Sequence, residues 1–242
     1  MSATPPRMQL ACSACNLRDL CMPSGLAAAD MARLDGLITS RRTVKRRAAL
    51  YRRGDPFTAL YAVRSGIFKS CQQSEGGAEL VTGFHMAGEI LGMEGIDQDL
   101  HTCDAVALED AEVCVMPFDA VCQLAREIPG VQRQLHRIMS REIVRDHGVM
   151  QLLANMRAEE RVASFLLNLL QRLQARGFSG SELVLRMSRQ DIGSFLGLTL
   201  ETVSRTLSKL AADGLLEVQH RHIRILDSEA RRRWQRQLDA AT

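Results

Sequence analysis

The spacing of apolar residues changes at Pro129, and this change divides the chain into two regions that must fold differently. Between Thr43 and Phe118, short apolar runs alternate with polar residues and are interrupted by glycine, as in LYAVRSGIFKS. Such alternation with tight turns indicates antiparallel β-strands, and turn signals about ten residues apart suit a small barrel or roll. After Pro129 the apolar residues recur at steps of three and four, which is the period of a helix. We therefore expect an α+β protein with an N-terminal antiparallel β-roll followed by helices.

A long helix is expected over residues 128–157, with a narrow apolar stripe on one face. A narrow stripe on an otherwise charged helix is typical of a seam between two helices, and a surface helix packed on its own domain is the alternative. The seam residues are Leu135, Met139, Ile143, Asp146, Met150 and Leu153. We predict that this helix pairs two chains in a homodimer. In such a pair the two Asp146 carboxylates repel each other and weaken the association, whereas a simple exposed aspartate is the alternative.

The segment RMSRQDIGSFLGLTLETVSRTLSKLAADGLLEVQHRHIRIL holds the start and stop signals of two short helices. Ser188 and Asp191 resemble a capping box, Gly197 ends the first helix, and the hydroxyl of Thr199 can cap the second. The alternating residues that follow predict a short β-hairpin. Two helices around a glycine turn and a β wing describe a winged helix-turn-helix, whose second helix enters the DNA major groove.

The polar face of that second helix carries side chains that can read base pairs. Arg205 can bond guanine, and Glu201 can accept from cytosine. The candidate base contacts are Glu201, Ser204 and Arg205, and the candidate phosphate contacts are Thr202, Thr206 and Lys209. A solvated helix face with a Glu–Arg pair is the alternative. The opposite, buried face is expected to comprise Leu200, Val203, Leu207 and Leu210.

Three of the seven cysteines lie close together near the N-terminus. They are Cys12, Cys15 and Cys21, and the other four are Cys71, Cys103, Cys114 and Cys122. In a chain without an export signal, clustered thiols indicate metal ligands or a redox sensor rather than a disulfide framework. From the residues alone, a structural zinc site and a redox disulfide between Cys12 and Cys15 both remain open.

Composition excludes several classes of protein. No apolar run approaches the roughly 20 residues of a membrane span, and no secretory signal is present, so a cytoplasmic location without membrane contact is expected. No catalytic motif is found, so we do not expect an enzyme. Residues 186–236 hold ten Lys and Arg against six acids, which suits a surface that faces phosphate. The basic run RRTVKRRAALYRR at 41–53 is interpreted as a solvated edge of the roll.

Several stretches together resemble the CRP/FNR superfamily of bacterial transcription regulators, and its FNR branch in particular. They are LYAVRSGIFKS, TGFHMAGEILG, AEVCVMPF, AEERVASFLLNL, RGFS and DIGSFLGLTLETVSR, and the resemblance extends from Cys12 to about Asp227. It implies a β-roll like that of cyclic-nucleotide-binding domains, a long dimerisation helix and a C-terminal winged helix-turn-helix. The implied domains are an arm at 1–25, the roll at 26–127, the dimerisation helix at 128–157 and the DNA-binding domain at 158–242.

The resemblance also implies a cofactor. FNR-type sensors carry C-x2-C-x5-C in an N-terminal arm and a fourth cysteine before an apolar-Pro-Phe segment, which Cys114 in VCVMPF matches. The implied ligands of an oxygen-labile [4Fe–4S] cluster are Cys12, Cys15, Cys21 and Cys114. The intact cluster would favour a dimer that binds a TTGAT/ATCAA-like palindrome in double-stranded DNA and works with RNA polymerase on anaerobic-metabolism genes. A regulator with a structural zinc or a thiol redox switch is the alternative, and Cys103 is the rival fourth ligand.

The resemblance does not extend to the ligand of the nucleotide-binding relatives. Gly88 and Glu89 match their glycine–acid pair, but the segment HTCDA lacks the arginine that contacts the cyclic phosphate. Asp104 in this segment would instead repel a phosphate. A haem ligand would need a residue such as His85, and a lone histidine in a strand is more often structural.

Overall fold

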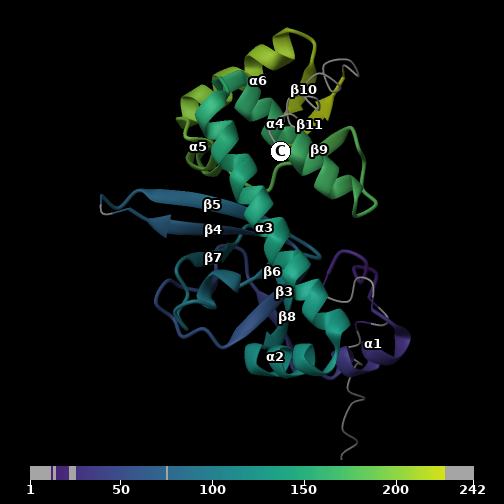
Figure 1. Ribbon diagram of the computed structural model, residues 1–242. Helices are drawn as coiled ribbons and strands as arrows, with labels where there is room; N and C mark the ends of the chain where they lie inside the picture. Colours follow the sequence, from purple (N-terminus) through teal and green to yellow (C-terminus); the bar gives the residue numbers. More distant parts are fainter. Residues whose placement is uncertain (1–11, 13–14, 22–25, 75, 227–242) are drawn as a thin grey trace, which may run out of the picture. The chain divides into compact units, whose positions relative to one another are not determined.

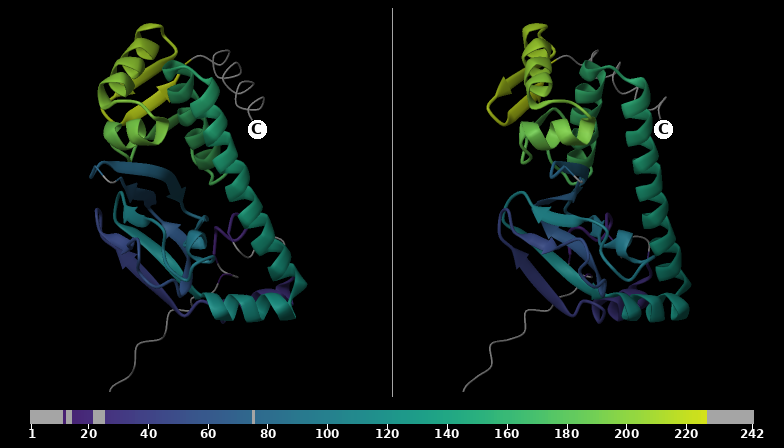
Figure 2. Two further views of the ribbon diagram at one scale, coloured as in Figure 1. Left: turned by 60° about the vertical axis from the view of Figure 1, so that its left-hand side comes forward. Right: turned by 90° about the vertical axis from the view of Figure 1, so that its left-hand side faces the viewer.

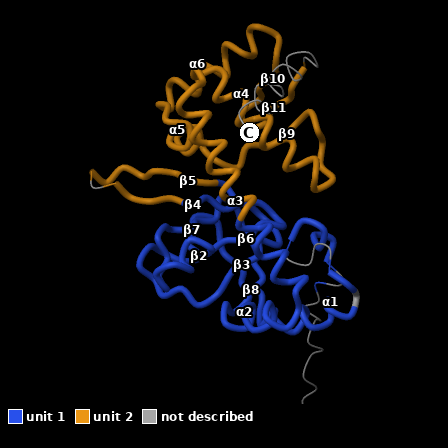
Figure 3. Tube along the Cα trace, in the orientation of Figure 1, with its two compact units in different colours: residues 1–70, 84–139 blue, residues 71–83, 140–242 orange. Residues whose placement is uncertain are grey.

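The computed structural model describes residues 12, 15–21, 26–74 and 76–226 (Figure 1). The chain forms two compact units, which are described separately below (Figure 3). The first unit comprises residues 1–70 and 84–139, and the second comprises residues 71–83 and 140–242. Within the described ranges, no helix is long and apolar enough to cross a membrane.

The alternating region forms the antiparallel roll that its pattern predicted. One sheet has the strand order β1 (Ser40–Val44), β8 (Ala111–Pro117), β3 (Ala59–Ser65) and β6 (Ile90–Leu91). The short η1 helix (Met93–Gly95) follows β6 in the chain. The other sheet has the order β2 (Ala49–Tyr51), β7 (Asp104–Ala107), β4 (Ile67–Gln73) and β5 (Glu79–Met86). Strand β8 pairs antiparallel with both β1 and β3, so it lies inside its sheet rather than at an edge.

The two faces of the first sheet bury different residues, because successive side chains of a strand point to opposite faces. Val113 belongs to a core that includes Phe68 and Cys103 from the second sheet and the segment before it. Met116 belongs to another core, which forms where the first sheet meets three helices, and Cys114 packs against this second core. The alternation along β8 thus separates the interior of the roll from the face that the helices cover.

Those helices are α1 (Ala28–Asp35), α2 (Phe118–Glu127) and the start of α3 (Pro129–Asn155). They bury Leu34, Val121, Val131 and Ile138 in the second core. Helix α1 ends at Asp35, and Gly36 caps it. Helix α3 is continuous, as predicted (Figure 2), and begins with Pro129, whose fixed backbone suits the first helical position.

Much of the predicted seam of α3 is exposed in the single chain. Met139, Ile143 and Met150 are 38%, 55% and 64% exposed, and Asp146 is exposed among them. Leu135 packs partly against the second core, and the side chain of Leu153 is half-buried. Exposed apolar side chains in a row on one helix favour a partner surface. The homodimer and the separate dimerisation segment at 128–157 therefore stay predictions that this exposure supports.

The second unit contains the winged helix-turn-helix. Its elements are α4 (Ala158–Gln174), β9 (Glu182–Val184), α5 (Arg189–Leu196), α6 (Leu200–Ala212), β10 (Leu216–Gln219) and β11 (His222–Ile225). Asp191 and Ser188 form the predicted capping box, Gly197 ends α5 in the left-handed region, and Thr199 accepts a hydrogen bond from the Thr202 amide. The wing is a three-stranded sheet in the order β10, β11, β9, of which the sequence predicted only the hairpin.

The turn between the two helices packs closely on Gly193. A Cβ atom at this glycine would lie 2.6 Å from the carbonyl oxygen of Leu198, so that any larger residue would displace the turn. Arg161 of α4 joins the helix ends around them. Its guanidinium donates to the carbonyl oxygens of Leu153 at 2.8 Å, Met156 at 2.9 Å and Leu196 at 3.0 Å. These bonds satisfy carbonyls at the ends of α3 and α5 and in the turn between α3 and α4.

Residues 71–83, which form the end of the β4–β5 hairpin, belong to the second unit (Figure 3). They are held there by Ser194 of α5. The Ser194 hydroxyl accepts from the Val81 amide at 2.9 Å and donates to the Glu79 carbonyl oxygen at 2.8 Å. One hydroxyl can make both bonds, because it carries one donor and two acceptor positions.

Candidate functional site

The arm residues 15–21 form a compact turn that brings its cysteines to one side. The Cys15 amide donates to the Cys12 carbonyl oxygen at 3.0 Å, and the Cys21 amide donates to that of Leu17 at 3.0 Å. Two further bonds attach the turn to helices: the Cys12 amide donates to Asp35, and Gln134 Nε2 donates to the Cys21 carbonyl oxygen at 3.3 Å. The arm is therefore fixed at α1 and near the start of α3.

Cys114 reaches the same place from the sheet. It lies on β8, directly opposite Arg41 of β1 and Ala62 of β3. Because Val113 points into the roll, its neighbour Cys114 must point to the other face, where the helices and the arm lie. The alternation of a single strand thus delivers the fourth thiol to the three arm cysteines.

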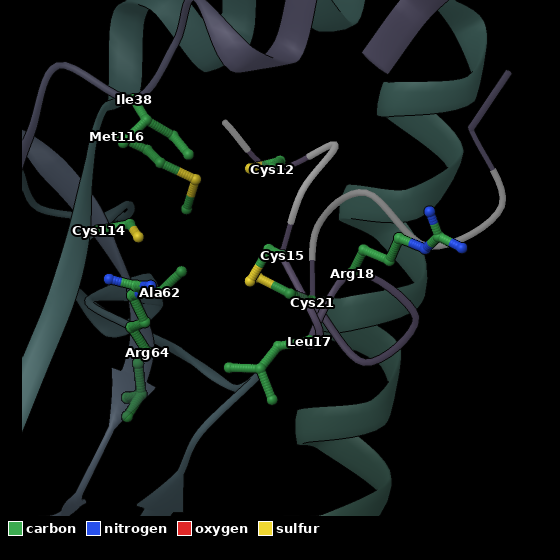
Figure 4. Close-up of a pocket in the computed structure, with 11 residues that line it drawn as sticks. Cys12, Cys15, Leu17, Arg18, Cys21, Ile38, Ala62, Arg64, Cys114 and Met116 are labelled. Atoms are coloured by element: carbon green, nitrogen blue, oxygen red, sulfur yellow. The ribbon is translucent and has the colours of Figure 1, made fainter. Parts of the chain in front are cut away.

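The four cysteines line one pocket, which is walled largely by apolar side chains (Figure 4). Cys12, Cys15 and Cys21 lie on the arm side, and Cys114 lies on the sheet side. The other lining residues are Leu17, Arg18, Ile38, Ala62, Val63, Arg64 and Met116. The structure therefore brings together all four residues that the resemblance implied as ligands.

Two of these thiols, those of Cys12 and Cys114, are hard to ionise because they are buried. The pKa of the Cys12 thiol is raised to about 12, chiefly by burial and then by the negative charges of Cys21 and other neighbours. Burial also raises the pKa of the Cys114 thiol, and the positive charges of Arg41 and Arg64 oppose that shift. Both thiols are consequently protonated at neutral pH in the metal-free chain, and a metal group that binds them must displace their protons.

The donor set fits a bulky thiolate-bound group. All four donors are sulfur, the ligand type of iron–sulfur clusters. The four sulfurs surround a common space (Figure 4). Cys103, the rival ligand, is 6% exposed and packs in the interior of the roll, on the other side of the first sheet.

Helix α6 exposes most of the residues that were predicted to face DNA. Glu201 and Arg205 are exposed, Ser204 is half-exposed, and Arg205 Nη2 donates to the Thr202 hydroxyl at 3.4 Å. The buried face contains Val203, Leu207 and Leu210, as predicted. Leu200 was also expected there, but it is 44% exposed, because it is the first residue of the helix and projects beyond the neighbours that cover the next turn.

Two of the three candidate phosphate contacts have environments that the sequence did not reveal. Thr206 is only 6% exposed, so its hydroxyl lies on the buried side of α6 and is not carried into the phosphate set. Lys209 forms an ion pair with Glu159 of α4, and this pair raises the pKa of Lys209. Lys209 must therefore leave a carboxylate before it can contact a phosphate.

Two arginines that were not predicted as individual DNA contacts lie at the start of α5 and in the wing. Arg189 Nη2 donates to the His220 carbonyl oxygen at 3.1 Å, and Arg221 Nη1 donates to that of Arg186 at 3.3 Å. The pKa of Arg189 is lowered by burial and by the positive charge of Arg221. Two cations held this close favour a neighbouring anion. The available sequence signal was their position at the helix start and the hairpin turn, the parts of such a motif that border DNA.

Comparison with known proteins agrees with this architecture. Residues 160–233 match the Crp-like helix-turn-helix domain family, and residues 41–127 match the cyclic nucleotide-binding domain family. The chain is 44% identical to the transcriptional activator protein FnrA of Stutzerimonas stutzeri over 91% of this chain and 90% of that protein. It is 42% identical to the anaerobic regulatory protein of Haemophilus influenzae over 89% and 84% of the two chains. The solved structure of FixK2 from Bradyrhizobium japonicum superposes with a TM-score of 0.74 at 30% identity, over 81% and 96% of the two chains.

The raised pKa of Cys12 predicts slow alkylation in the reduced, metal-free protein. Iodoacetamide reacts with the thiolate, which is scarce near pH 8 when the pKa is about 12. We expect Cys12 to react at least about tenfold more slowly than glutathione, because the higher nucleophilicity of a basic thiolate offsets only part of the loss. Mass spectrometry of the peptide containing Cys12 measures this rate, which should keep rising above pH 9. A plateau at or below pH 9 would contradict the buried environment.

Proposed function

Because this chain belongs to the CRP/FNR family of transcription regulators, whose members are not enzymes, we propose that it senses oxygen through a [4Fe–4S] cluster and controls anaerobic-metabolism genes. The proposed ligands are Cys12, Cys15, Cys21 and Cys114. The name of the Haemophilus relative, an anaerobic regulatory protein, supports the physiological role. The observation that carries the proposal is the convergence of four thiols from two separate parts of the chain on one apolar pocket.

The residues around the pocket connect the ligands to the helices. The Cys21 carbonyl oxygen accepts from Gln134 of α3, next to the seam residue Leu135. The Cys12 amide donates to Asp35 at the end of α1. When bound, the cluster supplies an iron–sulfur group that oxygen can oxidise and break down. Because the arm is hydrogen-bonded to α1 and α3 beside its thiols, we propose that binding through the thiols strengthens these contacts and so sets the position of the start of α3.

The proposed target is double-stranded DNA, bound by two α6 helices of a homodimer in successive major grooves roughly 34 Å apart. Glu201, Ser204 and Arg205 read bases in a TTGAT/ATCAA-like palindrome, as the family resemblance implies. We propose the phosphate contacts Thr202 and Lys209, together with Arg189 and Arg221. RNA polymerase is a proposed further partner on family resemblance alone.

The match to the cyclic nucleotide-binding domain family raises a second candidate ligand, but the roll offers it a poor site. The Glu89 carboxylate accepts from the Met86 amide at 3.0 Å, so it is engaged within its own turn. The Asp104 carboxylate accepts from the Arg53 amide at 2.8 Å and lies 3.7 Å from the Arg52 guanidinium. An acid in this position repels a cyclic phosphate. We therefore propose that the roll does not sense a cyclic nucleotide.

The ligand assignment predicts that Cys114→Ser abolishes cluster binding as completely as Cys12→Ser. Cys71→Ser and Cys122→Ser are the matched controls, and we expect them to retain wild-type iron. Iron and acid-labile sulfide are measured on samples purified without oxygen, and the absorbance of the wild type should bleach in air. Full iron content in Cys114→Ser would transfer the fourth ligand to Cys103, and a colourless wild type containing zinc would replace the cluster with the zinc alternative.

The ion pair of Lys209 predicts that Glu159→Gln strengthens DNA binding. Removal of the competing carboxylate frees Lys209 for a phosphate, and because exposed ion pairs are weak we expect a gain of at most about fivefold in affinity. Palindromic and random DNA should gain alike, because a phosphate contact carries no base information. Fluorescence anisotropy at fixed salt measures both. The gain in affinity should vanish in a Lys209→Ala background, and a gain that survives without Lys209 refutes the competition. As a contrast, Arg205→Ala should weaken binding to the palindrome more than binding to random DNA.

The position of Asp146 in the seam predicts that Asp146→Ala favours the dimer. Two facing carboxylates about 6 Å apart repel by around 1 kcal/mol in water and by more as the interface loses water. The cluster-free variant should therefore shift towards dimer and bind DNA more tightly in air. Sedimentation velocity of the cluster-free protein measures the monomer fraction. An unchanged fraction would show that Asp146 is an ordinary exposed aspartate.

A further inference from the structure

The charges around Cys114 are arranged on one face of the first sheet. Arg41 lies directly opposite Cys114 on β1, and directly opposed residues of paired strands have Cβ atoms about 5 Å apart. Ala62 lies opposite Cys114 on β3. Arg64 lies where the register shifts between Val63 and Ser65, and it lines the pocket and pairs with Glu112. Glu112 shares this face as well, because it lies two residues before Cys114 on β8. Two arginines thus flank the sheet-borne thiol from both neighbouring strands.

The two arginines differ in how their charge is balanced. Arg64 Nη1 lies 2.8 Å from Glu112 Oε2, and both side chains are partly buried, so much of the charge of Arg64 is neutralised. Arg41 Nε is buried and has no hydrogen-bond partner within the described part of the chain. Arg41 was expected on a solvated edge of the roll, yet it is only half-exposed. The positive charge of Arg41 is therefore the less compensated of the two.

A group held by four thiolates needs such a charge. The thiolates carry more negative charge than an iron–sulfur core carries positive charge, so the assembly is an anion in a largely apolar pocket. Burial of an uncompensated charge is costly, and a cation in the next strand lowers that cost. Positive charge near a cluster also favours its reduced, more negative form and so raises its reduction potential.

We propose that Arg41 is the counter-ion of the four-cysteine ligand set. From its cross-strand position beside Cys114, its guanidinium stabilises the negative charge that the thiolates carry when they bind, and raises the reduction potential of the group they hold. Arg64 contributes less, because Glu112 neutralises it. This inference rests on the proposed function only in that the four cysteines act together as ligands.

The test compares Arg41→Gln with Arg42→Gln in the full-length chain. Arg42 is the neighbouring arginine on β1, is exposed, and lies opposite Val113 rather than Cys114, so its removal changes the net charge equally at a matched position. The first readout is Co²⁺ titration of the reduced, metal-free protein, followed by thiolate-to-cobalt absorption. We expect Arg41→Gln to weaken cobalt binding about tenfold and Arg42→Gln to stay within about twofold. Arg41→Lys, which keeps the charge, should recover most of the loss.

The second readout is the reduction potential of protein reconstituted with ferrous iron and sulfide under argon. Arg41→Gln should shift it to a more negative value, while Arg42→Gln and Arg41→Lys remain near wild type. Thermal unfolding of the metal-free variants checks that each one is folded. If Arg41→Gln is unstable, Arg41→Lys still tests the role of the charge, because it should keep the cobalt affinity and the reduction potential near wild type. Equal effects of Arg41→Gln and Arg42→Gln in both readouts, or a wild type without any thiolate–cobalt absorption, would overturn the proposal. If Arg41→Gln alone weakens cobalt binding but the wild-type chain forms no cluster, the counter-ion role of Arg41 is supported and the proposed oxygen sensor is refuted.

Discussion

Strand β8 places its side chains alternately on two faces of the first sheet, and the rest of the candidate site depends on that alternation. Val113 packs inside the roll, and Cys114 therefore faces the helices and the cysteine arm. A shift of the strand by one residue would bury the thiol among the interior side chains and leave the arm cysteines without their fourth partner. Pairing with β1 and β3 on both sides fixes the register, which makes Cys114 the rigid member of the set.

The arm is the adjustable member. Its turn is short, and a single hydrogen-bonded turn is not stable without outside contacts. Those contacts come from Asp35, Gln134 and the apolar wall of the pocket. Binding of a group by the thiols and ordering of the arm are thus parts of one equilibrium, because ligand binding stabilises whichever conformation brings the donors together. Because the pKa values of Cys12 and Cys114 are raised, their thiols must also release protons when they bind such a group.

Local signals in the sequence predicted local structure well. The capping box of α5, the glycine at its end and the threonine cap of α6 all depend on side chains within three residues of the backbone groups that they bond. Strand β9 was missed, because three residues are too few to show a period. The pair of Lys209 with Glu159, 50 residues away, and the burial of Thr206 depend on how α4 packs against α6. Spacing alone could not have selected Cys114 over Cys103, since the burial of Cys103 inside the roll and the position of Cys114 on the helix side depend on how the two sheets pack. Family resemblance supplied that choice.

The bond of Ser194 to the hairpin has a consequence for solubility. Strand β5 is the last strand of its sheet, so its outward amide and carbonyl groups form an open edge. Open edges recruit strands from other chains and so promote aggregation. The hydroxyl of Ser194 occupies the Val81 amide and the Glu79 carbonyl, two groups on the same side of the strand that a foreign strand would need. The helix-turn-helix therefore acts as a cover for the edge of the hairpin, and protects the protein from strand exchange for as long as the bond is made.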